Sequence, residues 1–318
     1  MSSDPAAQRI FGILMTRNDA DILRANILLH LSIGCERVLV VDNGSTDETP
    51  KILKQLARKY PVESSTDTGE LRQPEIVTEL AHKAREQGAD WVIPLDTDEF
   101  WRPTRPLAEL CAEADGLGAL EAPRIEFVTA HDQIHSTRKG PLRATMRVEP
   151  VLLGDQPVAE FASKRRSMFE IAPPSKLLMR TTPELTIARG AHSATGLAGP
   201  IEVNPDLAIF HLAMRSRDEA FSRVEHGERI NRVDSRPNVS VQNRYWLEMA
   251  GEDRLDEAWR AHSYEDGALE VAGRRVELVE DDRLARMLEP WVLTRPELIG
   301  RKVARRLRSR TGSPEAVR

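Results

Sequence analysis

Three acidic residues stand at the end of an apolar run near residue 95. The run is WVIPL (91–95), and the acids are Asp96, Asp98 and Glu99. Two carboxylates at i, i+2 spacing on a turn can offer oxygen atoms to a hard divalent cation, Mg²⁺ or Mn²⁺. Such a cation could bridge phosphates and neutralise the charge that builds up on a departing nucleoside diphosphate. Taken alone, however, this spacing is more typical of a solvated turn or a helix cap.

Two further polar clusters follow apolar runs earlier in the chain. They are Thr16, Arg17, Asn18 and Asp19 after IFGILM (10–15), and Asp42 to Ser45 after RVLVV (37–41). In an open parallel sheet, ligands bind outside the carboxyl ends of the strands. If the three strands are parallel, all three clusters share one rim, and Asp42 is placed to accept hydrogen bonds from a base or ribose.

The apolar pattern of the first hundred residues alternates between two periods. Short apolar or β-branched runs predict strands at 10–15, 37–41, 62–65 and 91–95. Apolar residues at helical spacing predict helices over 18–33, from the capping-box pair Ser45 and Glu48 onward, and over 74–87. Strands that alternate with helices form βαβ units, so we predict an α/β fold with a mostly parallel central sheet flanked by helices.

The pattern is weaker beyond Pro103. We expect a helix near 107–114, a strand at 121–130, a mixture of strands and long loops over 130–200, and a strand at 206–210. Ser216 and Glu219 have capping-box spacing, which predicts a helix from Ser216. The C-terminus has a helical pattern and contains the basic run RKVARRLRSR (301–310).

Composition and motifs exclude several classes of function. The 45 Lys and Arg residues against 50 Asp and Glu give a net charge of −5, which argues against nucleic acid as a partner. No GxGxxG follows the first strand and no GxxxxGK[ST] occurs, which disfavours dinucleotide and P-loop sites. Cys35 and Cys111 lack metal-ligand spacing and indicate a reducing compartment. The apolar runs are too short for a signal peptide or a transmembrane helix, so we expect a cytoplasmic protein.

The strand-end clusters together resemble a known family. TRNDADILRANILLHLSIGCERVLVVDNGSTDET (16–49) and ADWVIPLDTDEF (89–100) are similar to the family 2-like nucleotide-sugar glycosyltransferases of the GT-A fold, in a bacterial branch with DNGSTD and DxDEF motifs. The resemblance is strong over about 10–102 and continues more weakly into IFHLAMRSRDEAFSRVEHG (209–227). It implies metal-dependent transfer of a sugar from a nucleoside-diphosphate sugar to a hydroxyl acceptor, and it favours inversion. The acceptor class, whether glycan, lipid-linked or small molecule, stays open.

The resemblance also implies roles for individual residues. Those implied to bind the nucleotide sugar are Thr16, Arg17, Asn18, Asp19, Asp42, Asp96 and Arg215. Those implied to hold Mn²⁺ or Mg²⁺ are Asp98 as principal ligand, His211 and Asp96. Asp19 stands where the branch often has the longer Glu. Lys176 and Arg223 are weaker phosphate candidates, because a solvated or salt-bridged surface position is more common for such residues.

The catalytic base is not marked by an acidic motif. RGAHS (189–193) occupies the place where one is expected, so His192 is a candidate base or an acceptor contact. Asp132 and Glu170 are further candidates. Each of the three is more often a loop residue.

The resemblance suggests a division of the chain. We predict a nucleotide-sugar-binding half at 1–102, an acceptor-side half at 103–235 that completes the GT-A domain, and a helical C-terminal extension at 236–318. The basic run 301–310 could contact anionic lipid at the inner face of a membrane, although a solvated helix is the commoner outcome.

Two other functions stay open. A sugar-nucleotide pyrophosphorylase shares the substrate class, but it usually has a glycine-rich loop after the first strand, which TRNDAD (16–21) lacks. A non-catalytic nucleotide-binding module with the same fold is the other alternative.

Overall fold

A seven-stranded sheet lies at the centre of the N-terminal half of the computed structural model, which describes residues 8–70, 72–149, 161–233 and 241–310. Four neighbouring strands are parallel: β1 (Ile10–Thr16), β2 (Arg37–Asp42), β3 (Val62–Thr66) and β4 (Trp91–Leu95). Beyond β4 the sheet continues through antiparallel β9 (Lys176–Arg180), then β6 (Ala119–Ala122) and β12 (Ile201–Val203). The four parallel strands therefore end at one edge of the sheet.

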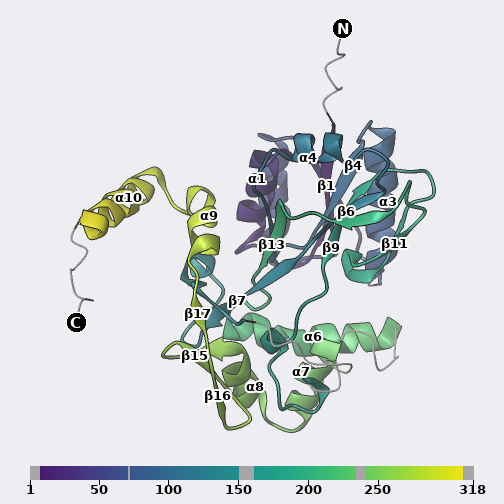
Figure 1. The fold of residues 1–318 in the computed structure, drawn as a ribbon. Helices are drawn as coiled ribbons and strands as arrows, with labels where there is room; N and C mark the ends of the chain where they lie inside the picture. Colours follow the sequence, from purple (N-terminus) through teal and green to yellow (C-terminus); the bar gives the residue numbers. More distant parts are fainter. Residues whose placement is uncertain (1–7, 71, 150–160, 234–240, 311–318) are drawn as a thin grey trace.

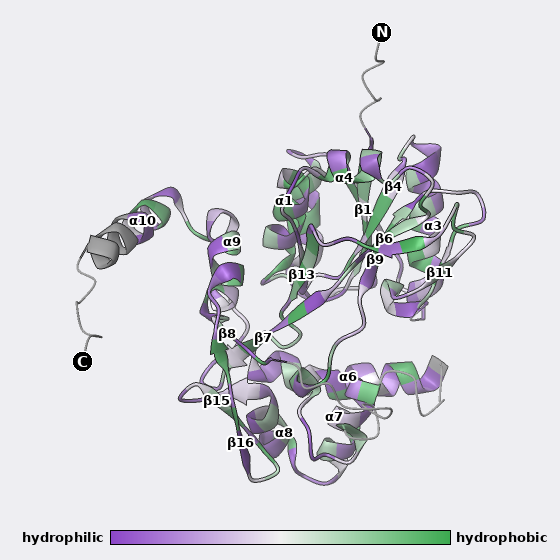
Figure 2. Cartoon of the chain, in the orientation of Figure 1, coloured by the Kyte–Doolittle hydropathy of each residue, from purple (hydrophilic) through white to green (hydrophobic). Residues whose placement is uncertain are grey.

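Helices cover both faces of this sheet because its central strands are apolar on both sides. Along β1, Leu14 belongs to the core on one face and Ile13 to the core on the other. The helices on the first face are α1 (Leu23–Ser32), α2 (Thr49–Ala57) and α4 (Leu107–Glu113). The helix on the second face is α3 (Gln73–Glu86). Figure 2 shows β1 and β4 as apolar strands between more polar helices.

A second sheet carries strands from the middle of the chain. Its members are β17 (Val279–Glu280), β8 (Met146–Arg147), β7 (Arg124–Ala130), β13 (Leu207–His211), β5 (Glu99–Pro103) and β14 (Ser263–Tyr264). Because β13 is antiparallel to β5 and parallel to β7, His211 lies opposite Glu99 on one side and Glu126 on the other. This register brings a late histidine next to the acidic turn that follows β4.

The C-terminal elements lie outside the seven-stranded sheet, most of them below it and the last two helices to its left (Figure 1). They are α6 (Arg217–Val233), α7 (Val241–Gly251), α8 (Leu255–His262), β15 (Ala268–Val271), β16 (Arg274–Glu277), α9 (Arg283–Val292) and α10 (Arg295–Arg310). Leu284 and Leu288 of α9 share a core with Leu29 of α1, whereas α10 extends away from the body. Among the described residues, no helix is both long and apolar enough to cross a membrane.

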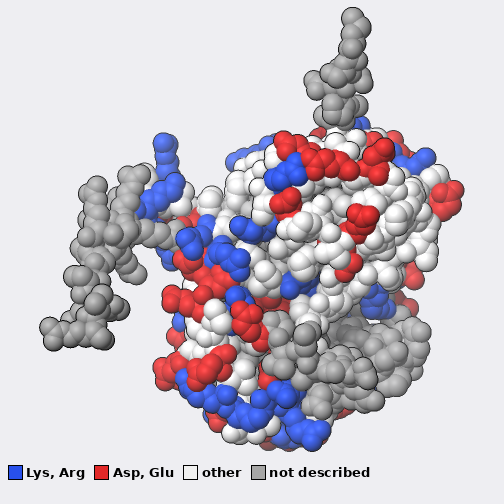
Figure 3. All heavy atoms as spheres, viewed as in Figure 1, with Lys and Arg blue, Asp and Glu red and all other residues white. Residues whose placement is uncertain are grey.

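Short elements complete the described chain. They are η1 (Gly140–Arg143), η2 (Met168–Glu170), η3 (Arg189–Ala191), β10 (Thr186–Ile187) and β11 (Ala194–Thr195). Cys35 and Cys111 are free thiols in the same buried core. On the face shown in Figure 3, acidic and basic side chains are mixed over most of the surface.

The predicted α/β class, with a mostly parallel central sheet flanked by helices, is confirmed. The strand predicted at 121–130 is instead two strands, β6 and β7, which separate around Pro123 and join different sheets. A proline has no N–H to donate to a ladder, which favours such a break. The helical extension predicted at 236–318 also contains the β15–β16 hairpin. The boundaries at 102 and 235 stay predictions.

Two predicted helix starts are wrong by several residues. α1 begins at Leu23 rather than at Asn18, because Asn18 has a φ of 55° and Asp19 begins a turn. α2 begins at Thr49 without a side-chain cap, because Ser45 donates its N–H and hydroxyl to Asp42 instead. In both places the residues at the strand end form a local turn that delays the helix.

Candidate active site

A pocket of about 420 Å³ lies at the carboxyl ends of β1 and β4, with α6 opposite them. Its lining includes all of Thr16–Asp19, Asn43 of the second cluster, and all of Asp96–Glu99. The expectation that three strand-end clusters share one rim is therefore confirmed. Asp42 itself is buried and does not line the pocket, because its carboxylate accepts hydrogen bonds from Ser45. Its predicted contact with a base or ribose stays a prediction.

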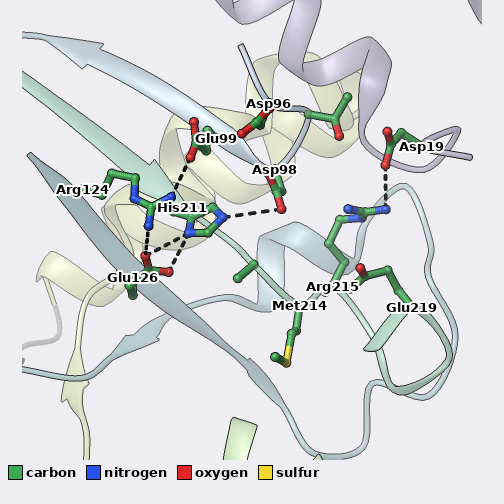
Figure 4. A network of polar contacts seen from close by, with 12 residues as sticks. Asp19, Asp96, Asp98, Glu99, Arg124, Glu126, His211, Met214, Arg215 and Glu219 are labelled. Atoms are coloured by element: carbon green, nitrogen blue, oxygen red, sulfur yellow. Dashed lines mark hydrogen bonds and ion pairs between the residues drawn. The ribbon is translucent and has the colours of Figure 1, made fainter. Parts of the chain in front are cut away.

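The first cluster is held by an arginine from the far end of the chain. Thr16 donates its hydroxyl to Asp19 (2.8 Å), and Arg215 donates from Nη2 to the other oxygen of Asp19 (3.0 Å). Arg215 also donates from Nε to Asp21 (3.0 Å), so its guanidinium ties the loop after β1 to the start of α6. Figure 4 shows the contact of Arg215 with Asp19. Burial raises the pKa of Asp19 even though Arg215 opposes this rise. Arg215 lines the pocket, and its predicted role towards a diphosphate stays a prediction.

A histidine lies between two carboxylates at the acidic turn. The Nδ1 atom of His211 lies 2.7 and 2.9 Å from the carboxylate oxygens of Glu126. Its Nε2 atom faces Asp98 Oδ2 at 3.5 Å (Figure 4). Burial alone would lower the pKa of His211, but Glu126 and Asp98 raise it to about 10. Burial likewise opposes charge on Asp98, yet the positive charge of His211 lowers the Asp98 pKa well below its usual range.

The pair of Asp98 and His211 fits a divalent cation. A carboxylate that binds Nδ1–H orients a metal-ligating imidazole and leaves Nε2 free to ligate. Glu126 has this position, and the 3.5 Å between His211 Nε2 and Asp98 is long for a hydrogen bond. Among the described residues, no group of three His, Cys, Asp or Glu side chains forms a full metal shell. Mg²⁺ commonly takes one or two protein ligands and completes its shell with water and phosphate oxygens.

A buried lysine holds the first acid of the turn. Lys176 of β9 is 1% exposed and pairs through Nζ with Asp96 and with Glu99, the latter at 2.5 Å. Burial opposes its charge, but Asp96 and Glu99 raise the Lys176 pKa. The surface position that we favoured for Lys176 is therefore wrong: the lysine is salt-bridged but buried. Asp96 lines the pocket with its carboxylate bound to Lys176, and its role as a metal ligand stays a prediction.

The candidate bases lie in different places. His192 lies 2.8 Å through Nδ1 from the carbonyl oxygen of Ser175, and its neighbours Arg189 and Gly190 line the pocket. Asp132 is ion-paired with Arg143 and is 74% exposed. Neither Asp132 nor His192 is part of the pocket lining. The role of His192 stays a prediction.

Glu170 has a structural position. Its carboxylate accepts the N–H of Ser167 in a capping box and pairs with Arg166 and Arg274. It is not part of the pocket lining, so the structure does not bring it to the strand ends.

Sequence reasoning missed a charged network behind the site. Glu99 is 0% exposed, and Arg124 donates to it (2.9 Å) while lying 3.6 Å from Glu126. Arg124 and Glu126 are charged residues at i, i+2 on a strand whose other half is buried and apolar. That alternation was a signal that one side of β7 faces charged partners rather than the core.

Sequence reasoning also missed two polar residues of α1. Asn26 is fully buried and donates from Nδ2 to the backbone carbonyls of Asp96, Thr97 and Glu99 at 2.8 to 3.0 Å. His30, one helical turn later, accepts the N–H of Trp101 at 3.3 Å. Polar residues at i, i+4 in the apolar stretch 22–33 were the available signal. Together they fix the backbone of the acidic turn.

One protein-family model matches part of the chain. Residues 13–122, about a third of the chain, match the family described as "Glycosyl transferase family 2". No curated protein matches. The matched segment contains Asp42, Asp98 and all of the first strand-end cluster, but not His211 or Arg215.

The search of solved structures returned matches that are distant in sequence and have low TM-scores. S. aureus TarS 1–349 in complex with UDP-GlcNAc is 14% identical with a TM-score of 0.40, covering 80% of this chain and 72% of that one. The mannosyltransferase PcManGT from Pyrobaculum calidifontis, in complex with GDP-Man and Mn²⁺, is also 14% identical with a TM-score of 0.40, covering 97% and 83%. Residues 13–122 of this chain are thus similar to the family described as "Glycosyl transferase family 2".

Proposed function

We propose that the chain transfers a sugar from a nucleoside-diphosphate sugar to a hydroxyl acceptor, with a divalent cation and with inversion at the sugar. The observation that carries this proposal is the convergence of Asp98 and His211 on one pocket, with Glu126 orienting the imidazole. The family 2 match over 13–122 supports the reaction class. The strand-end clusters support a nucleotide at the rim.

Each charged residue has a separate task in this proposal. Asp98 and His211 hold Mg²⁺ or Mn²⁺, which when bound neutralises charge on the departing nucleoside diphosphate. Glu126 accepts the Nδ1–H of His211 and keeps Nε2 directed at Asp98. Lys176 binds Asp96 and so fixes its carboxylate at the pocket edge.

The proposed base is His192. If its Nδ1–H is donated to the carbonyl of Ser175, its Nε2 is the atom that can accept the proton of the acceptor hydroxyl. Desolvation by the surrounding protein, with Lys176 and Arg124 nearby, lowers the pKa of the exposed His192 side chain to about 4, so the ring is neutral at pH 7. A weak base of this kind acts only when the hydroxyl is held within hydrogen-bond reach.

The test is a panel of UDP, GDP and dTDP sugars with Mn²⁺, measured by calorimetric binding and by donor hydrolysis. We expect one nucleotide sugar to bind in the presence of Mn²⁺. We expect Asp98→Asn to abolish the part of that binding that depends on Mn²⁺. Asp115→Asn removes an exposed acid outside the pocket and is the matched control. The proposal fails if no donor binds or is hydrolysed and Asp98→Asn equals wild type. Binding without any turnover would favour a non-catalytic module, and the anomeric configuration of the product tests inversion.

We also infer that α10 contacts anionic lipid. The helix extends from the body (Figure 1), and Ile299, Arg301 and Lys302 are exposed on it. Basic amphipathic helices bind such surfaces through charge and apolar contact. Sedimentation with phosphatidylserine liposomes, with and without residues 301–318, tests this inference. Equal sedimentation of both chains would contradict it.

A further inference from the structure

The pocket wall opposite the strand ends is basic. Arg223, His226 and Arg229 occur at intervals of three residues on α6, so all three lie on one side of the helix and line the pocket. Arg17 from the end of β1 and Arg189 from η3 line the same pocket. We call Arg17, Arg189, Arg223 and Arg229 the arginine cluster.

Acidic residues match only part of this positive charge. Glu219 lies 3.6 Å from Arg223, and Glu225 lies 4.0 Å from Arg17. For Arg189 and Arg229, the described part of the chain offers no carboxylate within 4.0 Å. Two of the four guanidinium groups, those of Arg189 and Arg229, therefore lack a carboxylate partner among the described residues.

Two members of the arginine cluster, Arg223 and Arg229, have N–H groups that could donate to a ligand. The Nε atom of Arg223 is buried and, among the described residues, has no hydrogen-bond partner. Arg229 donates to the side-chain oxygen of Asn43 (3.0 Å), a neutral acceptor. A buried N–H without a partner costs free energy unless a ligand or water supplies an acceptor.

The positive charges also affect one another. Enclosure in the pocket wall, together with Arg223, Arg229, Arg189 and Arg17, lowers the pKa of His226 to about 4. Enclosure and the nearby Arg17 likewise lower the pKa of Arg229. The cluster is therefore a region of positive potential that an anion would relieve.

The proposed donor does not need these two guanidinium groups. A nucleoside-diphosphate sugar carries two negative charges, and one divalent cation at Asp98 and His211 balances them. The donor–cation complex is then neutral, and Arg189 and Arg229 still lack a carboxylate partner among the described residues. A phosphate monoester carries close to two negative charges at neutral pH and matches these two guanidinium groups.

We propose that the arginine cluster binds a phosphate group on the acceptor, so that the acceptor is a hydroxyl compound that carries a phosphate monoester. Guanidinium groups suit this ligand because their planar N–H pairs bind phosphate oxygens bidentately. The inference rests on the proposed function, and it specifies the chemical class of the acceptor at the same pocket.

The test is a calorimetric titration of inorganic phosphate into the full chain at pH 8 and low salt, without nucleotide and with Mg²⁺ plus saturating nucleoside diphosphate. The nucleotide is chosen by prior titration of UDP, GDP and dTDP. We expect phosphate to bind in both states. Arg189→Gln and Arg229→Gln should each weaken this binding about tenfold, which is typical for loss of one charge-assisted contact. Arg232→Gln removes an exposed arginine of α6 outside the pocket and should change nothing.

Three results would overturn the proposal. Loss of phosphate binding when nucleotide and Mg²⁺ are present would assign the arginine cluster to the donor diphosphate. Acetate that binds as tightly as phosphate would assign the site to a carboxylate. Binding that both pocket variants leave unchanged, with melting temperatures equal to wild type, would place the phosphate elsewhere. If no nucleotide binds at all, the proposed function fails, while the nucleotide-free titration still measures the anion site by itself.

Discussion

Glu126 lies 2.7 Å from the Nδ1 atom of His211, and this contact directs the opposite ring nitrogen at Asp98. The two residues come from neighbouring parallel strands, β7 and β13, whose register pairs them directly. The orientation of the imidazole is thus built into the sheet and does not depend on a loop.

Glu126→Gln should weaken Mn²⁺ binding by about 10- to 100-fold, because an amide orients the imidazole less strongly and adds no negative charge. Isothermal titration of Mn²⁺ into the full chain measures this change. Glu121→Gln, on β6 and outside the pocket, is the matched control. Equal affinity of Glu126→Gln and wild type would show that Glu126 does not support a cation site.

Lys176→Met should lower the free energy of unfolding by about 3 kcal/mol at pH 7, because it leaves the buried Glu99 with only Arg124 as partner. Burial already raises the pKa of Glu99, and loss of the Lys176 charge raises it further, so protonation stabilises the folded variant. The difference in the free energy of unfolding between the variant and wild type should therefore become smaller as the pH falls below the raised pKa of Glu99. Urea unfolding from pH 7 to 5 measures it, with the exposed Lys54→Met as control. A loss that stays constant with pH would contradict the assigned cause.

Asn26→Leu should remove the donors to the carbonyls of Asp96, Thr97 and Glu99 and release the acidic turn. Unpaired buried carbonyls cost about 1–3 kcal/mol, so the free energy of unfolding should fall by about that amount. Mn²⁺ affinity should fall with it, since Asp98 is part of this turn. Gln55→Leu on the exposed face of α2 is a control. If the variant is destabilised but binds Mn²⁺ with wild-type affinity, the conformation of the acidic turn does not determine Mn²⁺ binding.

His262 predicts a pH dependence of stability that is unrelated to the pocket. Burial lowers its pKa from 6.5 to about 4, and the ring accepts the N–H of Met168. Since the folded pKa is below the unfolded one, the unfolded state binds the proton first as the pH falls. Stability is thus fully present above pH 6.5 and declines towards pH 4, by about 1.4 kcal/mol per pH unit for this residue.

His262→Gln should therefore flatten the stability profile between pH 6.5 and 4, even if it lowers stability at pH 7. Chemical unfolding at four or five pH values across this window measures the slope. Parallel profiles for the variant and wild type would show that the pKa of His262 is the same in the folded and unfolded states.

The fold near the first two strands was predictable because it depends on local pattern. The apolar runs before Thr16 and Asp96 give buried parallel strands, and parallel strands bring their ends to one edge. The turns at those ends were less predictable. Ser45 donates its hydroxyl to Asp42 and so does not cap a helix. Local hydrogen bonds between side chains compete with helix caps, and the hydrophobic pattern of the sequence does not reveal them.

The rest of the site could not be predicted from local pattern. Lys176, Arg124 and Glu126 meet the acidic turn through strand pairings between distant parts of the chain. The register between strands that are far apart in the sequence depends on which strands pair. Neither the hydrophobic period nor the strand propensity of a segment specifies that pairing. Asn26 was accessible in principle, since a buried amide in an apolar helix requires partners.

The tie between Arg215 and Asp19 joins residues 196 positions apart, and it has a consequence for how the molecule folds. The segment that matches the family model, 13–122, holds the acidic turn but lacks β13, and therefore lacks both Arg215 and His211. Contacts of such long sequence separation form late, because loop closure must come first. Refolding should thus restore the parallel strands before it restores the proposed cation site, so Mn²⁺ binding by that site should return in a late step of assembly.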